Sequence, residues 1–171
     1  MKNIILIGMS SVGKSKSGII LSKNINKKYY DEDDNFELLN GPIHIVRNIL
    51  KEEHYQMLQQ KNKKIMYNLE NHVISAGGKT GMCLDLRKYF LKSSVIILLK
   101  PSLDYILNKY DKKKKDLSQK NLRRKLVFET NAVISKEYET RYALMQQNAN
   151  IILDTSYLKK DEIAALIESK I

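Results

Sequence analysis

The chain has 171 residues, 43% of them hydrophobic, and a mean hydropathy of −0.41, which together favour one soluble globular domain over residues 1–171. No apolar run approaches the roughly 20 residues that span a bilayer, so we expect no membrane partner. The net charge of +11 suits anionic ligands. No helix-turn-helix, zinc-finger or aromatic RNA-binding pattern accompanies that charge, so we expect no nucleic-acid partner.

The cysteine and histidine residues further narrow the class of protein. A single cysteine, Cys83, excludes an internal disulfide and fits a reducing compartment. The three histidines are scattered without metal-ligand spacing. The N-terminus shows no signal-peptide pattern, so we expect a cytoplasmic protein.

A strand, a glycine loop and a helix follow one another at the start of the chain. Residues 3–7 are apolar and β-branched, which indicates a buried strand. The next stretch, GMSSVGKS from Gly8 to Ser15, fits the P-loop pattern G-x-x-x-x-G-K-[ST], and a helix can begin near Ser17. The sequence therefore predicts that the protein binds ATP or GTP.

The P-loop pattern predicts roles for individual residues in nucleotide binding. Backbone amides and the helix dipole suit a polyphosphate. Lys14 is expected to reach the β- and γ-phosphates, and the hydroxyl of Ser15 is expected to bind Mg²⁺. The predicted nucleotide-binding residues are Gly8, Ser10, Ser11, Val12, Gly13, Lys14, Ser15 and Lys16.

An acidic run, Asp31 to Asp34, follows a short second strand over residues 28–31. Carboxylates beside a phosphate site can hold Mg²⁺ through water or accept a proton from an attacking hydroxyl. The alternative is an acidic turn that caps the next helix.

The remaining elements alternate. We expect a helical stretch over residues 44–71, strands over 72–75, 95–99 and 150–154, a short helix over 84–91 and a terminal helix over 160–169, with Ser102 capping another helix. Strands separated by helices predict an α/β fold with a parallel sheet covered on both faces. Ligands should bind at the carboxyl ends of its strands.

Three later features can carry function. Gly77 and Gly78 end the third strand, where they allow a ligand to approach the backbone or simply form a turn. Arg141, late in a helical segment, is suited to a carboxylate or phosphate, although a lone arginine is often a surface residue. The lysine-rich segment over about 110–125 is either a mobile lid over the nucleotide or a solvated loop.

Taken in order, these motifs make the chain resemble the shikimate kinases, small P-loop kinases of the nucleoside-monophosphate-kinase-like group. The P-loop is met at 8–15, the aspartate–x–aspartate motif at 31–33, the glycine motif at 76–78, and the closing arginine motif in ETRYAL at 139–144. The stretch VRNIL at 46–50 is similar to the segment before the family's substrate helix. The resemblance covers the full length and implies a three-layer fold with strand order 2-3-1-4-5.

The resemblance also implies a reaction and residue roles. ATP and shikimate would give ADP and shikimate 3-phosphate, by a monomer with Mg²⁺ as cofactor. Asp31 would help hold Mg²⁺, Asp33 would bind the shikimate hydroxyls and accept the proton, and Arg141 would hold the carboxylate. Gly77 and Gly78 would lie along the substrate, and a helical segment over about 34–62 would also bind it. Lys115 would stand where a lid arginine contacts the nucleotide.

The substrate half departs from the family pattern. Gln56 and Gln59 stand where the family has a carboxylate-binding arginine and a glutamate, and Lys79 replaces the third glycine. A shikimate kinase of this sequence therefore needs Lys79 or another cation in place of the missing arginine. The alternatives are a kinase with a changed small-molecule substrate and a nucleotide-binding protein with little catalysis.

Overall fold

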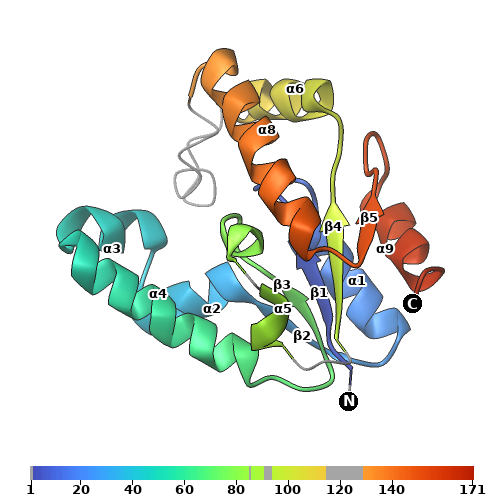
Figure 1. Cartoon of the computed structure of the whole chain (residues 1–171), viewed down its shortest axis with the longest axis horizontal. Helices are drawn as coiled ribbons and strands as arrows, with labels where there is room; N and C mark the ends of the chain where they lie inside the picture. The colour runs from blue at the N-terminus through green and yellow to red at the C-terminus, as the bar shows by residue number, and fades with distance from the viewer. Residues whose placement is uncertain (1, 85, 91–93, 115–128) are drawn as a thin grey trace.

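The computed structural model describes residues 2–84, 86–90, 94–114 and 129–171. Its strands form one parallel sheet in the order β2-β3-β1-β4-β5 (Figure 1). The strands are β1 (Ile4–Ile7), β2 (Lys28–Asp31), β3 (His72–Ser75), β4 (Val95–Leu99) and β5 (Ile151–Leu153). The predicted α/β class and strand order are thus confirmed.

The described helices cover both faces of the sheet (Figure 1). They are α1 (Lys14–Asn24), α2 (Glu32–Asn40), α3 (Ile43–Ile49), α4 (Glu52–Tyr67), the short 3₁₀ turn η1 (Thr80–Met82), α5 (Leu86–Tyr89), α6 (Leu103–Lys114), α8 (Asn131–Asn148) and α9 (Lys160–Glu168). Helices α1 and α9 pack together on one side, while α8 contacts β4 and η1 on the other. This arrangement gives three layers.

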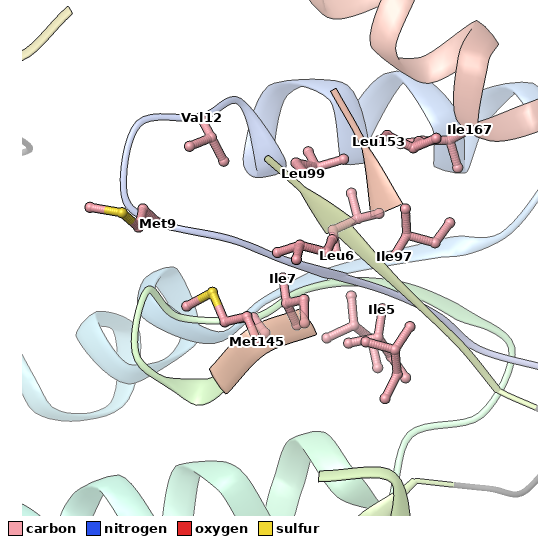
Figure 2. Close-up of a cluster of buried hydrophobic side chains, with 14 of the residues drawn as sticks. Ile5, Leu6, Ile7, Met9, Val12, Ile97, Leu99, Met145, Leu153 and Ile167 are labelled. Atoms are coloured by element: carbon pink, nitrogen blue, oxygen red, sulfur yellow. The ribbon is translucent and has the colours of Figure 1, made fainter. Parts of the chain in front are cut away.

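The core is centred on β1, whose four residues are all buried. A parallel strand with helices on both faces has no polar side, which explains its continuous apolar sequence. Figure 2 shows the alternation: Leu6 lies on the side of Ile97 and Ile167, and Ile7 lies on the side of Met145. A tightly packed central strand holds the loop that follows it in a fixed position.

The expected helix over 44–71 is two helices, and this prediction needs correction. Helix α3 ends before Leu50, and Leu50 and Lys51 both have extended backbone dihedrals before α4 begins. The preceding helix, α2, ends at Gly41, which has a φ of 89° that favours glycine. Helices α2, α3 and α4 form an arm beside the sheet (Figure 1).

The expected lysine-rich segment begins inside a helix. Helix α6 continues to Lys114, and Ser102 caps its start by accepting a hydrogen bond from the backbone of Tyr105 at 3.3 Å. Tyr110 is fully buried and donates its hydroxyl to the backbone oxygen of Ser10 at 3.0 Å. Most of the segment proposed as a lid, Lys115 included, lies outside the described residues.

Candidate active site

The loop between β1 and α1 has the backbone that a P-loop requires. Gly8 and Gly13 have φ angles of 143° and 116°, and Ser11 has a φ of 71°. A Cβ on Gly8 would lie 2.7 Å from the backbone oxygen of Leu99, so the neighbouring strand also demands glycine there. Val12 is buried and anchors the loop to the core.

Lys14, the first residue of α1, is folded into this loop. Its side chain is only 9% exposed, and Nζ donates to the backbone oxygens of Gly8 at 2.7 Å and Met9 at 2.9 Å. The two carbonyls hold the ammonium group over the loop. A phosphate bound to the loop amides would lie next to this charge.

Other lysines surround the loop. Lys113 of α6 donates to the hydroxyl of Ser11 at 3.1 Å, and a Cβ on Gly13 would meet Nζ of Lys160 at 2.7 Å. Burial and the nearby Lys109 lower the pKa of Lys160, since each disfavours another positive charge there. Lys16 is exposed on α1. The loop therefore lies in a positive environment suited to a polyphosphate. No local sequence pattern marks Lys160, which only the packing of α9 on α1 brings to the loop.

Ser15 and Asp31 converge on one side of the loop. The hydroxyl of Tyr29 lies 3.0 Å from Oδ2 of Asp31 and 2.9 Å from Oγ of Ser75, and the side chain of Ser15 is a further neighbour of this hydroxyl. Oδ1 of Asp31 accepts from the backbone amides of Asp33 and Asp34, so Asp31 also caps α2. Both the metal-binding and the capping interpretations of the acidic run thus apply to this residue. The Ser15 hydroxyl and the Asp31 carboxylate, which share Tyr29 as a neighbour, are hard oxygen donors that fit Mg²⁺.

Glu32 fastens the glycine loop to α2. Its carboxylate is buried and accepts from the backbone amide of Gly77 at 2.7 Å and from the hydroxyl of Thr80 at 2.9 Å. Burial raises the pKa of this carboxyl, because a low-dielectric environment disfavours its charged form. Sequence patterns did not separate Glu32 from its acidic neighbours, since only the folded chain shows which of them points inward.

The raised pKa of Glu32 predicts that the stability of the folded protein depends on pH. A carboxyl whose pKa is raised on folding contributes stability below its unfolded pKa, near 4.5, and that contribution is lost as pH rises through the raised folded pKa. Glu32→Gln removes this dependence. We expect the melting temperature of the native protein, minus that of the variant, to be largest at acidic pH and to fall as pH rises. Paired thermal scans across this range measure it, and a difference that grows with pH contradicts it.

A cavity of about 430 Å³ lies between the α2–α4 arm, the glycine loop and α8. Its walls combine carboxylates, cations and one tyrosine with the P-loop. The residues that line it are Ser10, Glu32, Asp33, Phe36, Ile43, Arg47, Tyr55, Gln59, Asn62, Lys63, Gly77, Gly78, Lys79, Thr80, Glu129, Val133, Glu137 and Arg141. Its volume is in the range of small-molecule sites, about 300–1,000 Å³.

Several residues chosen from the sequence meet in this cavity. Asp33 approaches the glycine loop so closely that a Cβ on Gly77 would lie 2.9 Å from its Oδ1. Gly78 is equally close to the P-loop, because its Cβ would lie 2.9 Å from Oγ of Ser10. Arg141 lies on the opposite wall with a side chain 12% exposed, and its Nε donates to Glu137 at 2.5 Å.

Gln56 is a correction to the predicted set, because it does not line the cavity. It follows Tyr55 on α4 and lies on the exposed face, where its amide donates to Oε1 of Glu52 at 2.9 Å. Arg47, Lys63, Glu129 and Glu137 line the cavity but were not anticipated. The segment holding Arg47 was noted in the sequence, but only the turn between α3 and α4 brings that arginine inward.

Metal-ligand clusters and membrane-spanning helices are absent from the parts of the chain that the structure describes. Within them, no three potential His, Cys, Asp or Glu ligands gather as a metal cluster. No described helix is long and apolar enough to cross a membrane.

Comparisons with known proteins agree with this arrangement. A family model described as shikimate kinase matches residues 10–171. A shikimate kinase of Sulfurihydrogenibium sp. (strain YO3AOP1) is 32% identical over 112 residues, which are 64% of this chain and 66% of the relative. A shikimate kinase of Thermodesulfovibrio yellowstonii is 26% identical over 168 residues, covering 98% of this chain and 93% of the relative.

Solved structures give the same fold. The shikimate kinase of Aquifex aeolicus superposes with a TM-score of 0.79 at 23% identity, covering 98% of this chain and 94% of that one. A shikimate kinase from Acinetobacter baumannii, solved in complex with shikimate, gives 0.80 at 18% identity, covering 99% and 92%. At these identities the likeness concerns the fold.

The P-loop after the central strand and the order of the sheet define a P-loop nucleotide-binding α/β protein. The small cavity beside the loop adds a place for a second substrate. Because the family model matches nearly the whole chain, the chain belongs to the shikimate kinase family.

Proposed function

We propose that this protein is a shikimate kinase, which transfers the γ-phosphoryl group of ATP to the 3-hydroxyl of shikimate and releases ADP and shikimate 3-phosphate. The observation that carries the proposal is the shared cavity. Ser10 of the P-loop, Asp33 and Arg141 line the same space, so a phosphate donor and a hydroxylated carboxylate can meet there.

The P-loop would hold the phosphates of ATP. Loop amides bind them, and Lys14 neutralises charge on the transferred group. Ser15 and Asp31 would hold Mg²⁺, which supplies further charge neutralisation at the phosphates. The lysines near Ser11 and Gly13 would add to the positive field. Lys115 stays a proposed nucleotide contact outside the described residues.

Asp33 would act on the acceptor hydroxyl. Its carboxylate accepts the hydroxyl proton while the oxygen forms a bond to the γ-phosphorus. The bond between that phosphorus and the bridging oxygen breaks, and ADP leaves with the electron pair. Gly77 and Gly78 let the substrate lie against the backbone, and Arg141 would hold its carboxylate.

A kinase for another small hydroxy acid is the second candidate. It is favoured by Gln56. The family pattern has a substrate-binding arginine at this position, whereas Gln56 lies on the exposed face of α4. The presence of Arg47, Lys63 and Lys79 in the cavity still suits an acidic substrate. We also propose that the protein works as a cytoplasmic monomer without nucleic-acid or membrane partners, which size-exclusion chromatography and cell fractionation test.

A substrate panel tests the assignment. ADP release is measured with MgATP and, in turn, shikimate, other small hydroxy acids and nucleoside monophosphates. We expect shikimate to give the highest kcat/KM. A higher value with another hydroxy acid replaces the substrate but keeps the kinase, whereas no stimulation by any acceptor contradicts the kinase assignment.

A further inference from the structure

The cavity holds an arginine, Arg47, whose position suggests a specific role. Arg47 lies on α3 and lines the cavity together with Arg141, which comes from α8 on another wall. We propose that Arg47 binds the carboxylate of the acceptor substrate and so takes the part of the arginine that α4 lacks. This inference rests on the proposed function and names the residue that determines its specificity for a carboxylate.

The guanidinium of Arg47 is held in place by Tyr55. One of its terminal nitrogens donates to the Tyr55 hydroxyl at 3.0 Å, and its central carbon lies 5.0 Å from the centre of the Tyr55 ring. The ring itself is only 3% exposed and packs edge-on against Phe36, with ring centres 5.8 Å apart. A planar cation fixed on a buried ring loses little freedom when it binds a carboxylate.

The guanidinium of Arg47 forms no ion pair with the residues that the structure describes, although the cavity contains four acidic residues. Two of these four have other partners: Glu32 binds the glycine loop, and Glu137 accepts a hydrogen bond from Nε of Arg141. A half-buried guanidinium that faces a cavity without a paired carboxylate is suited to an anionic ligand.

Tyr55 adds a donor at the same place. Its hydroxyl accepts from Arg47 and also from the amide of Gln59 at 3.0 Å. Among the described residues none accepts the hydroxyl hydrogen of Tyr55 in return. A carboxylate beside Arg47 can therefore receive a hydrogen bond from this phenol as well.

Arg47 fits this role better than the two lysines of the cavity. Lys63 acts electrostatically on the buried carboxylate of Glu32. Lys79 is exposed and has no contact that fixes it among the described residues. Lysine also lacks the planar fork that matches both oxygens of a carboxylate.

The test compares Arg47→Ala with the native enzyme on two acceptors, shikimate and its methyl ester, which keeps the ring hydroxyls but has no carboxylate charge. We expect kcat/KM for shikimate to fall about 10- to 100-fold and kcat/KM for the ester to change less than about threefold. Arg47→Lys should lose less than Arg47→Ala on shikimate. Lys51→Ala, which removes an exposed charge from the turn before α4, is the matched control and should leave both acceptors unchanged.

The outcomes separate the two proposals. A native enzyme that phosphorylates neither acceptor overturns the proposed function. Equal losses on both acceptors in Arg47→Ala, or a selective loss on shikimate in Lys79→Ala but not in Arg47→Ala, overturn the role of Arg47 while leaving the kinase intact. A selective loss on shikimate in Arg47→Ala alone supports it.

Discussion

Replacing Lys14 by alanine is expected to reduce kcat by about 10³-fold or more while the protein stays folded. The ammonium group lies over the P-loop, held by the carbonyls of Gly8 and Met9, and no other described cation is held in that way. Phosphoryl transfer depends mainly on positioning and charge neutralisation, and a single cation at the transferred group contributes about 10³–10⁵ in kcat in related chemistry. Steady-state assays of ADP release with saturating ATP measure the effect.

The control for this prediction lies on the same helix. Lys23→Ala removes an exposed charge from the last turn of α1, far along the helix from the loop, and should keep native activity. The loss of two hydrogen bonds makes Lys14→Ala less stable by about 1–3 kcal/mol, so the assay is run well below its melting temperature. Activity within tenfold of native in Lys14→Ala would contradict the role of the loop in catalysis.

The second large effect is expected from Asp33→Asn. The amide keeps the size of the side chain but cannot accept the hydroxyl proton as a carboxylate does. We expect kcat to fall about 10²–10⁴-fold, the usual contribution of general-base catalysis. Because Asp33 lies against Gly77 rather than the P-loop, ATP binding measured by calorimetry should change little.

Asp34→Asn is the matched control for Asp33. It neutralises the next residue in the same first turn of α2, where a carboxylate interacts with the helix dipole by at most about 1 kcal/mol. Asp34 is exposed and does not line the cavity, so its variant should retain native kcat. Equal losses in the two variants would mean that the effect arises from the charge of the helix end and not from proton transfer.

Much of the nucleotide-binding part of the site can be predicted from local sequence. An apolar strand, a glycine pattern with fixed spacing and a helix start are neighbours in the chain, and the structure keeps them as neighbours. The alternation of strands and helices indicated the parallel sheet. Its order was implied only by family resemblance, because crossover lengths alone do not decide which strands pair.

The substrate-binding part of the site was harder to predict from the sequence, because it is assembled from segments that lie far apart in the chain. The break between α3 and α4 contains no glycine or proline, so periodicity joined the two helices into one. Arg47 reaches the cavity only because that break turns α3 back over Tyr55. Glu32 and Asp33 are neighbours in sequence and both line the cavity, yet Glu32 is buried against the glycine loop whereas Asp33 is partly exposed.

The position of Arg47 also explains how the site can bind a carboxylate without an arginine at position 56. A carboxylate-binding charge can be provided from α3 when Tyr55 on α4 supports it, because both helices border the same cavity. The substitution therefore moves the cation from one helix to its neighbour. On this account the charge of the substrate site is preserved although its sequence motif is not.

Whether the chain phosphorylates shikimate is tested most directly by analysing the products that the purified native chain forms from MgATP with and without shikimate. ADP release and the mass of the acceptor are followed in the same reaction. We predict ADP release that depends on shikimate, with one phosphorylated shikimate formed for each ADP. ADP release without a phosphorylated acceptor, or ATP binding with no response to shikimate, would contradict it.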